Sequence, residues 1–189
     1  MNKRQKQTEA MLISCQYHAE DRLRDGRRMW LRAVRPSDRD LLREGMHHLS
    51  PESAYHRFFT AKRELSEREL DYLTQLDFVN HVALVAFVDN SSGPLLVGAA
   101  GYIVEHSEVR PKSAEVAFVV PDAHQRRGIG AVLLRHLAAI ARANGLRALH
   151  ALVLAENRPM MSVFRKSGLP MTTTCSEPGV LEVSLKLVP

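Results

Sequence analysis

One segment constrains the fold more than any other, because it joins two apolar strands through a long helix. Residues 113–120 and 149–154 are mostly apolar runs of strand length. Between them, apolar residues recur at helical spacing from Gly128 to Asn144, and Gly145 follows, where helices commonly end. Two strands joined by a helix form a βαβ crossover, in which the strands run parallel. The segment therefore predicts an α/β fold with a mixed sheet and this crossover near its centre.

The rest of the chain supplies further strands and a helical block that precedes most of them. Ser37, Ser50 and Ser66 stand at the cap positions of the three early helices, and Ser66 and Glu69 have the spacing of a capping box. Two further strands follow the last helix. The predicted strands are residues 30–34, 82–88, 95–104, 171–175 and 181–188, and the predicted helices are 37–48, 50–59, 66–76 and 158–167.

Composition is that of a folded protein with one catalytic or binding domain. The chain has 189 residues, of which 45% are hydrophobic and 25% charged. No apolar run reaches the ~18 residues that a membrane span needs, and the first residues lack the apolar core of a signal peptide. Two cysteines, Cys15 and Cys175, do not make a disulfide scaffold. We therefore expect a cytoplasmic protein with no membrane partner.

The excess positive charge lies at the N-terminal end. The net charge is +5, and residues 1–35 hold nine of the basic and four of the acidic residues. We expect residues 1–28 to form a basic arm, with a helix from about Thr8 to Arg24, and residues 29–189 to form the domain. We do not expect nucleic acid as a partner, because acids interrupt the basic run and no aromatic residues interleave with it to stack on bases.

The loop before the long helix has the chemistry of an anion site. The first N–H groups of a helix lack partners and lie at the positive end of its dipole. Gly128 and Gly130 have no Cβ, so an anion can approach the backbone, and Arg126 and Arg127 add charge. The sequence is neither a P-loop nor a good dinucleotide fingerprint, since Leu133 stands at the third glycine. Taken alone, the two glycines fit close helix packing equally well.

Two motifs together resemble those of a known family. Gln125-x-x-Gly128-x-Gly130 resembles the acetyl-CoA signature of the GCN5-related N-acetyltransferases (GNAT). The run from Asn157 to Leu169 resembles the family's second motif, which has Asn, a small residue, an aromatic, Lys and Gly at fixed spacing. Shorter stretches, among them residues 53–59 and 114–117, resemble the acetyltransferase domain of bacterial protein-lysine acetyltransferases.

The resemblance implies a fold and a cofactor. The fold is a mixed, mostly antiparallel sheet of six or seven strands with flanking helices, and its central parallel pair splays apart. Acetyl-CoA would enter the gap, and coenzyme A would be the product; no metal is expected. Asn157 would hydrogen-bond the pantetheine arm, and Phe164 would pack near the thioester. The cofactor residues implied are Phe118, Val119, Val120, Gln125, Arg126, Arg127, Gly128, Ile129, Gly130, Asn157 and Phe164.

Glu115 is the candidate catalytic base. An acid in the middle of an apolar strand needs a reason, and the resembled lysine acetyltransferases use the corresponding glutamate as a base. The alternative is a carboxylate paired to an arginine or lying on a solvated face. Phe164 stands where the family often has a tyrosine that protonates the leaving thiolate. Tyr102 or water is left as the substitute acid.

The sequence thus predicts an N-acetyltransferase that moves acetyl directly to an amine, with a protein lysine as the expected acceptor. Two alternatives stay open. In the first, the acceptor is a small-molecule amine or a protein N-terminus. In the second, the chain is a sensor that binds acetyl-CoA without turnover. A homodimer is a possible assembly.

Overall fold

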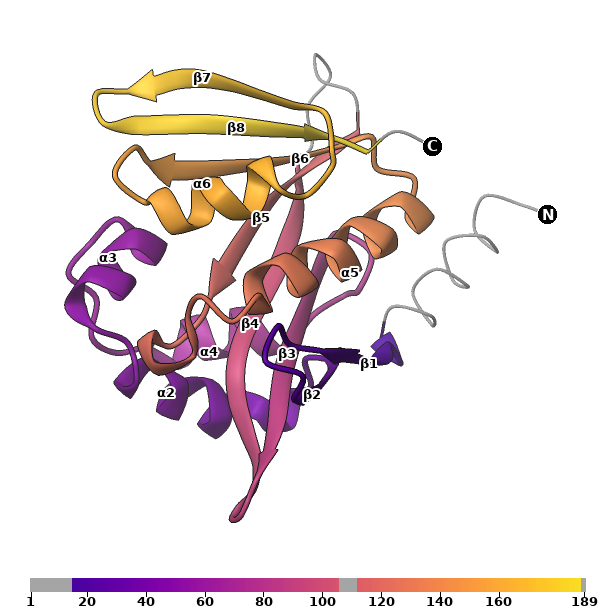
Figure 1. The fold of residues 1–189 in the computed structure, drawn as a ribbon, viewed down its shortest axis with the longest axis vertical. Helices are drawn as coiled ribbons and strands as arrows, with labels where there is room; N and C mark the ends of the chain where they lie inside the picture. The colour runs from indigo at the N-terminus through magenta and orange to yellow at the C-terminus, as the bar shows by residue number, and fades with distance from the viewer. Residues whose placement is uncertain (1–14, 106–111, 188–189) are drawn as a thin grey trace.

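The computed structural model describes residues 15–105 and 112–187, and an open sheet forms its centre (Figure 1). The strand order is β1-β2-β3-β4-β5-β6-β8-β7. All neighbouring strands pair antiparallel except β5 and β6, which are parallel. The strands are β1 (His18–Arg22), β2 (Arg28–Ala33), β3 (His81–Asn90), β4 (Gly93–Glu105), β5 (Ser113–Val119), β6 (Ala148–Leu154), β7 (Met171–Glu177) and β8 (Val180–Lys186).

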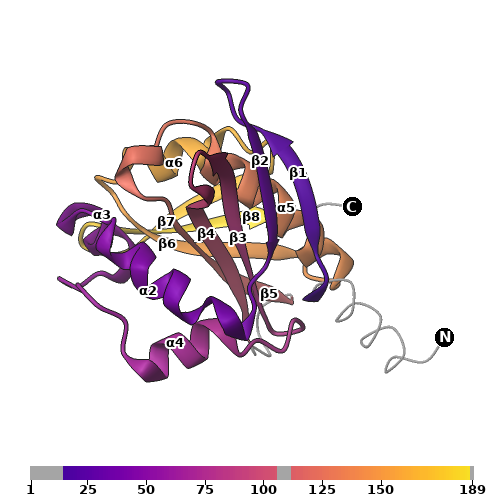
Figure 2. The same cartoon turned by 90° about the horizontal axis from the view of Figure 1, so that it is seen from below.

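Helices cover both faces of the sheet (Figures 1 and 2). The main core lies between one face and helices α5 and α6, while α2 and α4 enclose smaller apolar clusters on the other side. No helix in the described ranges is long and apolar enough to cross a membrane. The helices are α2 (Arg39–His47), α3 (Pro51–Phe58), α4 (Glu67–Thr74), α5 (Ile129–Ala143) and α6 (Arg158–Arg165), and short 3-10 turns occupy η1 (Pro36–Asp38) and η2 (Asp122–His124).

The predicted caps are confirmed for α3 and α4 but not for α2. Ser50 Oγ accepts a hydrogen bond from the Ser53 N–H at 3.1 Å, and Ser66 and Glu69 form a capping box. The prediction of Ser37 as the cap of the first helix is wrong. A 3-10 turn comes first, and Asp38 is the residue before α2. Its carboxylate accepts from the Arg35 N–H at 2.7 Å, which holds the chain in that turn.

Residues 18–22 of the N-terminal segment form a strand, so the prediction of a helix from Thr8 to Arg24 is wrong there. Strand β1 pairs antiparallel with β2 from His18 to Arg22, and Ala19 packs against the core. Residues 1–14 lie outside the described part of the chain. The sheet has eight strands rather than six or seven because β1 adds a strand at its edge.

The central parallel pair separates as the resemblance implied. Strands β5 and β6 pair only from Ser113 to Glu115 and from Ala148 to His150. Both strands then continue, to Val119 and Leu154, without further pairing to each other. One backbone edge of β5 is therefore left without a neighbouring strand. The end of β5 leads through η2 into α5, which packs across the sheet over β4.

Candidate active site

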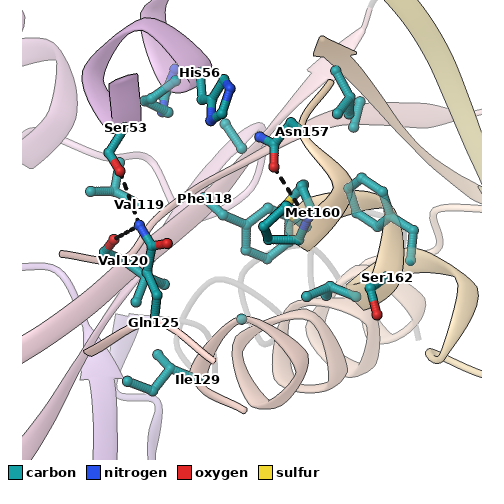
Figure 3. A pocket seen from close by; sticks show the side chains of 18 of the residues that line it. Ser53, His56, Phe118, Val119, Val120, Gln125, Ile129, Asn157, Met160 and Ser162 are labelled. Carbon is teal, nitrogen blue, oxygen red and sulfur yellow. Dashed lines mark hydrogen bonds between the residues drawn. The ribbon is translucent and has the colours of Figure 1, made fainter. Parts of the chain in front are cut away.

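A cavity of about 490 Å³ opens where β5 and β6 separate. The ends of α3, α5 and α6 border it, and Figure 3 shows side chains from all of these elements facing one space. Of the predicted site residues, Arg127 alone lies outside the lining. Those in the lining are Glu115, Phe118, Val119, Val120, Gln125, Arg126, Gly128, Ile129, Gly130, Asn157 and Phe164.

The start of α5 opens into this cavity without a capping side chain. Gly128 precedes the helix with a φ of 93°, in the left-handed region that favours glycine, and the first turn holds no acidic residue. The first bond of the helix runs from the Val132 N–H to the Gly128 carbonyl at 3.1 Å. The N–H groups of Ile129 and Gly130 precede that bond and have no partner within the helix. A helix start of this kind fits a pyrophosphate.

Three other helices in the described chain show the contrast, although α2 also begins without a capping side chain. Side chains of Ser50, Ser66 and Asn157 accept hydrogen bonds from the first turns of α3, α4 and α6. A Cβ built on Gly128 would lie 3.4 Å from the Arg24 Cγ atom, so the space over the glycine is narrow. The donors and the absent Cβ together form a cradle that a phosphate group can enter.

Hydrogen bonds to α3 fix the loop that leads to this cradle. The Gln125 side-chain amide donates to Ser53 Oγ at 2.9 Å and to the Val120 carbonyl at 3.2 Å (Figure 3). The Asp122 carboxylate accepts from the N–H and the hydroxyl of Ser50, at 2.9 and 2.8 Å. Gln125 therefore lines the cavity and also ties the loop to α3. The start of α5 is thereby held in place before any ligand arrives.

The middle of the cavity is apolar and borders the open edge of β5. Phe118 and Phe164 meet edge to face with 6.0 Å between ring centroids, and Phe164 is 1% exposed. Asn157 Oδ1 accepts from the Met160 N–H at 3.0 Å, which caps α6 (Figure 3). The amide nitrogen of Asn157 has no partner among the described residues. It is available to donate to a ligand carbonyl in the gap, as the resemblance implied.

Tyr102 does not reach the cavity, so its candidacy as the substitute acid is wrong. Its side chain is fully buried on the α5 face of the sheet. Its hydroxyl accepts a hydrogen bond from the Asn144 side-chain amide at 2.7 Å. Burial raises the pKa of Tyr102 to about 12, with the hydrogen bond from Asn144 opposing that shift. The register of β4 with β5 places Tyr102 opposite Val116, on the face away from Glu115.

Glu115 lies at the other end of the cavity, on the face of the sheet that α3 borders. It is exposed, and it is the last residue of β5 that pairs with β6, opposite His150. Arg57 of α3 also lines this end, and sequence reasoning missed it. Burial lowers the pKa of Arg57, and the nearby charge of Glu115 opposes the shift. A carboxylate and a guanidinium thus face the same space, without an ion pair between them in the described structure.

No group of three or more His, Cys, Asp or Glu side chains in the described ranges is arranged to hold a metal ion.

The site consists of three parts that follow one another along the cavity. These are the uncapped start of α5, the apolar gap between β5 and β6, and the carboxylate of Glu115. Such a row can hold a long ligand with an anionic end and can take a proton at its far end.

Comparisons with known proteins agree with this geometry. Residues 46–169 match the model of the acetyltransferase (GNAT) family, so the chain belongs to that family of acetyltransferases. The crystal structure of the GNAT domain of S. lividans PAT is similar, with a TM-score of 0.80 and 35% identity. That likeness covers 89% of this chain and 96% of the other.

Two curated relatives are similar in sequence. An acetyltransferase of Pseudomonas aeruginosa is 34% identical over 143 residues, which are 76% of this chain and 75% of that protein. The acetyltransferase Pat of Mycolicibacterium smegmatis is 31% identical over 77% of this chain. The chain spans only 42% of that second relative, which is much longer.

Proposed function

We propose that this acetyltransferase uses acetyl-CoA as its donor and a protein lysine as its acceptor. The observation that carries the proposal is the alignment of the three parts of the site along one cavity. The start of α5 would hold the pyrophosphate, and the open edge of β5 would pair with the pantetheine arm as an added strand does. The thioester would then lie near Phe164, within the gap and toward Glu115.

Glu115 would serve as the general base. A lysine amine has a pKa of about 10.4, so at pH 7 its neutral form lies about 4.6 kcal/mol uphill. A carboxylate that takes the proton during attack, directly or through water, removes much of that cost. The amine nitrogen bonds to the acetyl carbon, the carbon–sulfur bond breaks, and the proton that Glu115 takes from the amine passes through water to the sulfur. Backbone N–H groups near Val119 and Val120 would stabilise the oxyanion.

The surface around Glu115 supports a macromolecular acceptor. Ile103 is the register neighbour of Glu115 on β4, and His150 is its neighbour on β6. Side chains at such positions lie on the same face of a sheet. Ile103 is 39% exposed, and Leu152, two residues beyond His150, is 46% exposed. An open apolar face beside the base fits the surface of a protein better than it fits the closed pocket of a small amine.

The test is an assay of thiol release from acetyl-CoA with the purified chain. Glu115→Gln should lower turnover at least about 100-fold, the usual range for a lost general base. Glu64→Gln is the control, because Glu64 is exposed and does not line the cavity. Turnover of Glu115→Gln equal to that of the intact protein would contradict the assigned base.

A panel of acceptor amines, tested in the same assay, identifies the class of acceptor. Lysine-bearing proteins should react faster than free amino acids, polyamines and peptides whose only amine is the N-terminus. Faster turnover of any small amine would overturn the protein acceptor. Tight binding of acetyl-CoA with no release of thiol across the panel would indicate a sensor instead.

A further inference from the structure

The turn between β1 and β2 lies against the start of α5, although the two are about a hundred residues apart in sequence (Figure 1). The Arg24 N–H donates to the Arg127 carbonyl at 3.3 Å. Leu23 is buried in the main core, which anchors the turn. The side chain of Arg24 runs over Gly128 and lines the cavity at its cradle end. The N-terminal hairpin is therefore one wall of the phosphate cradle.

Contacts between β1 and α5 hold the hairpin in this position. The Asp21 carboxylate contacts Arg135, and it lies 3.1 Å from the Nε2 atom of His136. The Tyr17 hydroxyl hydrogen-bonds the Nδ1 atom of the same histidine at 2.6 Å. These side chains fix β1 to the helix whose first turn forms the cradle. The packing of the hairpin on α5 therefore fixes the backbone of Arg24 beside the cradle.

Two arginines of the same hairpin pair with carboxylates, whereas Arg24 pairs with none of the residues that the structure describes. Arg27 pairs with Asp25 at 2.8 Å, and Arg28 pairs with Glu20 at 2.9 Å. The described residues offer Arg24 no ion pair of this kind. It lies in the same cavity lining as Arg126, so two cations face this end. A guanidinium placed beside like charge, with no carboxylate, is suited to an anionic ligand.

His124 gives a second, independent sign of a ligand-binding site. It lines the cavity, and its Nδ1 atom is buried with no hydrogen-bond partner. Burial lowers the pKa of His124, and the charges of Arg127 and Arg27 lower it further. The cradle end is therefore a region of positive field with an unsatisfied polar atom. A phosphate would meet both conditions at once.

We propose that Arg24 binds a phosphate of acetyl-CoA and so completes the cradle from the N-terminal hairpin. The inference rests on the proposed function, because it needs acetyl-CoA as the ligand. Two phosphate sources are possible within that ligand, the pyrophosphate and the 3′-phosphate. The position of Arg24 over Gly128 favours the pyrophosphate.

The test measures dissociation constants by calorimetry for the intact protein, Arg24→Gln, Arg24→Lys and Arg28→Gln. Arg24→Gln should weaken acetyl-CoA binding about tenfold at low salt, the loss expected for one charged hydrogen bond. Arg24→Lys should recover part of the loss. Arg28→Gln removes an exposed, paired arginine of the same hairpin and should bind as the intact protein does. Equal affinity of Arg24→Gln and the intact protein would overturn the inference and leave the proposed function standing.

A second ligand and a salt series separate the remaining outcomes. The penalty is the loss of affinity in Arg24→Gln relative to the intact protein. If it persists with acetyl-dephospho-CoA, which lacks the 3′-phosphate, Arg24 binds the pyrophosphate. If it vanishes, Arg24 binds the 3′-phosphate. The penalty should shrink as salt rises, because exposed charges are screened. A penalty independent of salt would mean that Arg24 acts by packing, which contradicts the inference. Failure of the intact protein to bind acetyl-CoA would instead overturn the proposed function, and this inference with it.

Discussion

Replacing Gly128 by alanine tests the cradle. A matched variant separates the loss of stability caused by backbone strain from the loss of affinity for acetyl-CoA. The φ of 93° is unfavourable for any residue with a Cβ, and the left-handed conformation costs about 1–2 kcal/mol. The added methyl would meet Arg24 at 3.4 Å, an ordinary contact, so no clash adds to that cost. For a chain of this size the melting temperature should therefore fall by about 2–8 °C. The methyl would also lie against the Arg24 side chain at the cradle end of the cavity.

Gly168→Ala is the matched control. Gly168 has a φ of 76°, nothing lies within 4 Å of its built Cβ, and it is outside the cavity lining. Both variants should lose similar stability in thermal unfolding followed by circular dichroism. Only Gly128→Ala should lose affinity for acetyl-CoA, by about tenfold or more if one charged hydrogen bond is lost. Equal affinities in the two variants would refute the assignment of the cradle.

Two further predictions concern the fold. Arg32→Ala should lower the free energy of unfolding by about 3–5 kcal/mol in denaturant titration, because it leaves a buried carboxylate unpaired. The Asp38 carboxylate accepts two hydrogen bonds from Arg32, at 2.7 and 2.8 Å, and is 6% exposed. The control Arg28→Ala breaks an exposed ion pair and should lower the free energy of unfolding by under about 1 kcal/mol. Similar losses in the two variants would contradict this account. Burial lowers the pKa of His81, opposed by the charge of Asp77, so the unfolded chain binds a proton near pH 6.5 that the folded protein resists. The free energy of unfolding should therefore fall as pH drops below about 6.5, less steeply in His81→Gln, and an unchanged slope would count against it.

Local signals in the sequence predicted most of the elements because those signals act over a few residues. The caps at Ser50 and Ser66 are bonds within one turn, and the apolar runs of β3 and β5 report burial directly. Strand β1 was missed because its residues, His18–Arg22, are mostly polar and carry little of the apolar pattern of a strand. Pairing with β2 stabilises it, and such pairing between segments leaves little trace in a short window.

The residues of the candidate site also differ in whether local sequence signals could predict them. The cradle residues follow one another along the chain, so a motif with fixed spacing could reveal them. Arg24 and Arg57 come from segments far away in sequence and enter the lining only through the packing of β1 and α3. Tyr102 was a candidate acid because of its chemistry, but the register of β4 turns it to the opposite face. Sequence reasoning identifies the ligand-facing loop, and the fold decides which distant side chains complete it.

The central claim is that the cavity between β5 and β6 binds acetyl-CoA. Its most direct test is calorimetric titration of the intact protein with acetyl-CoA, with Gly128→Glu as the companion variant. The account predicts one site with micromolar affinity in the intact protein and no binding once a carboxylate side chain fills the cradle. Absence of binding to the intact protein, or unchanged binding to Gly128→Glu, would contradict it.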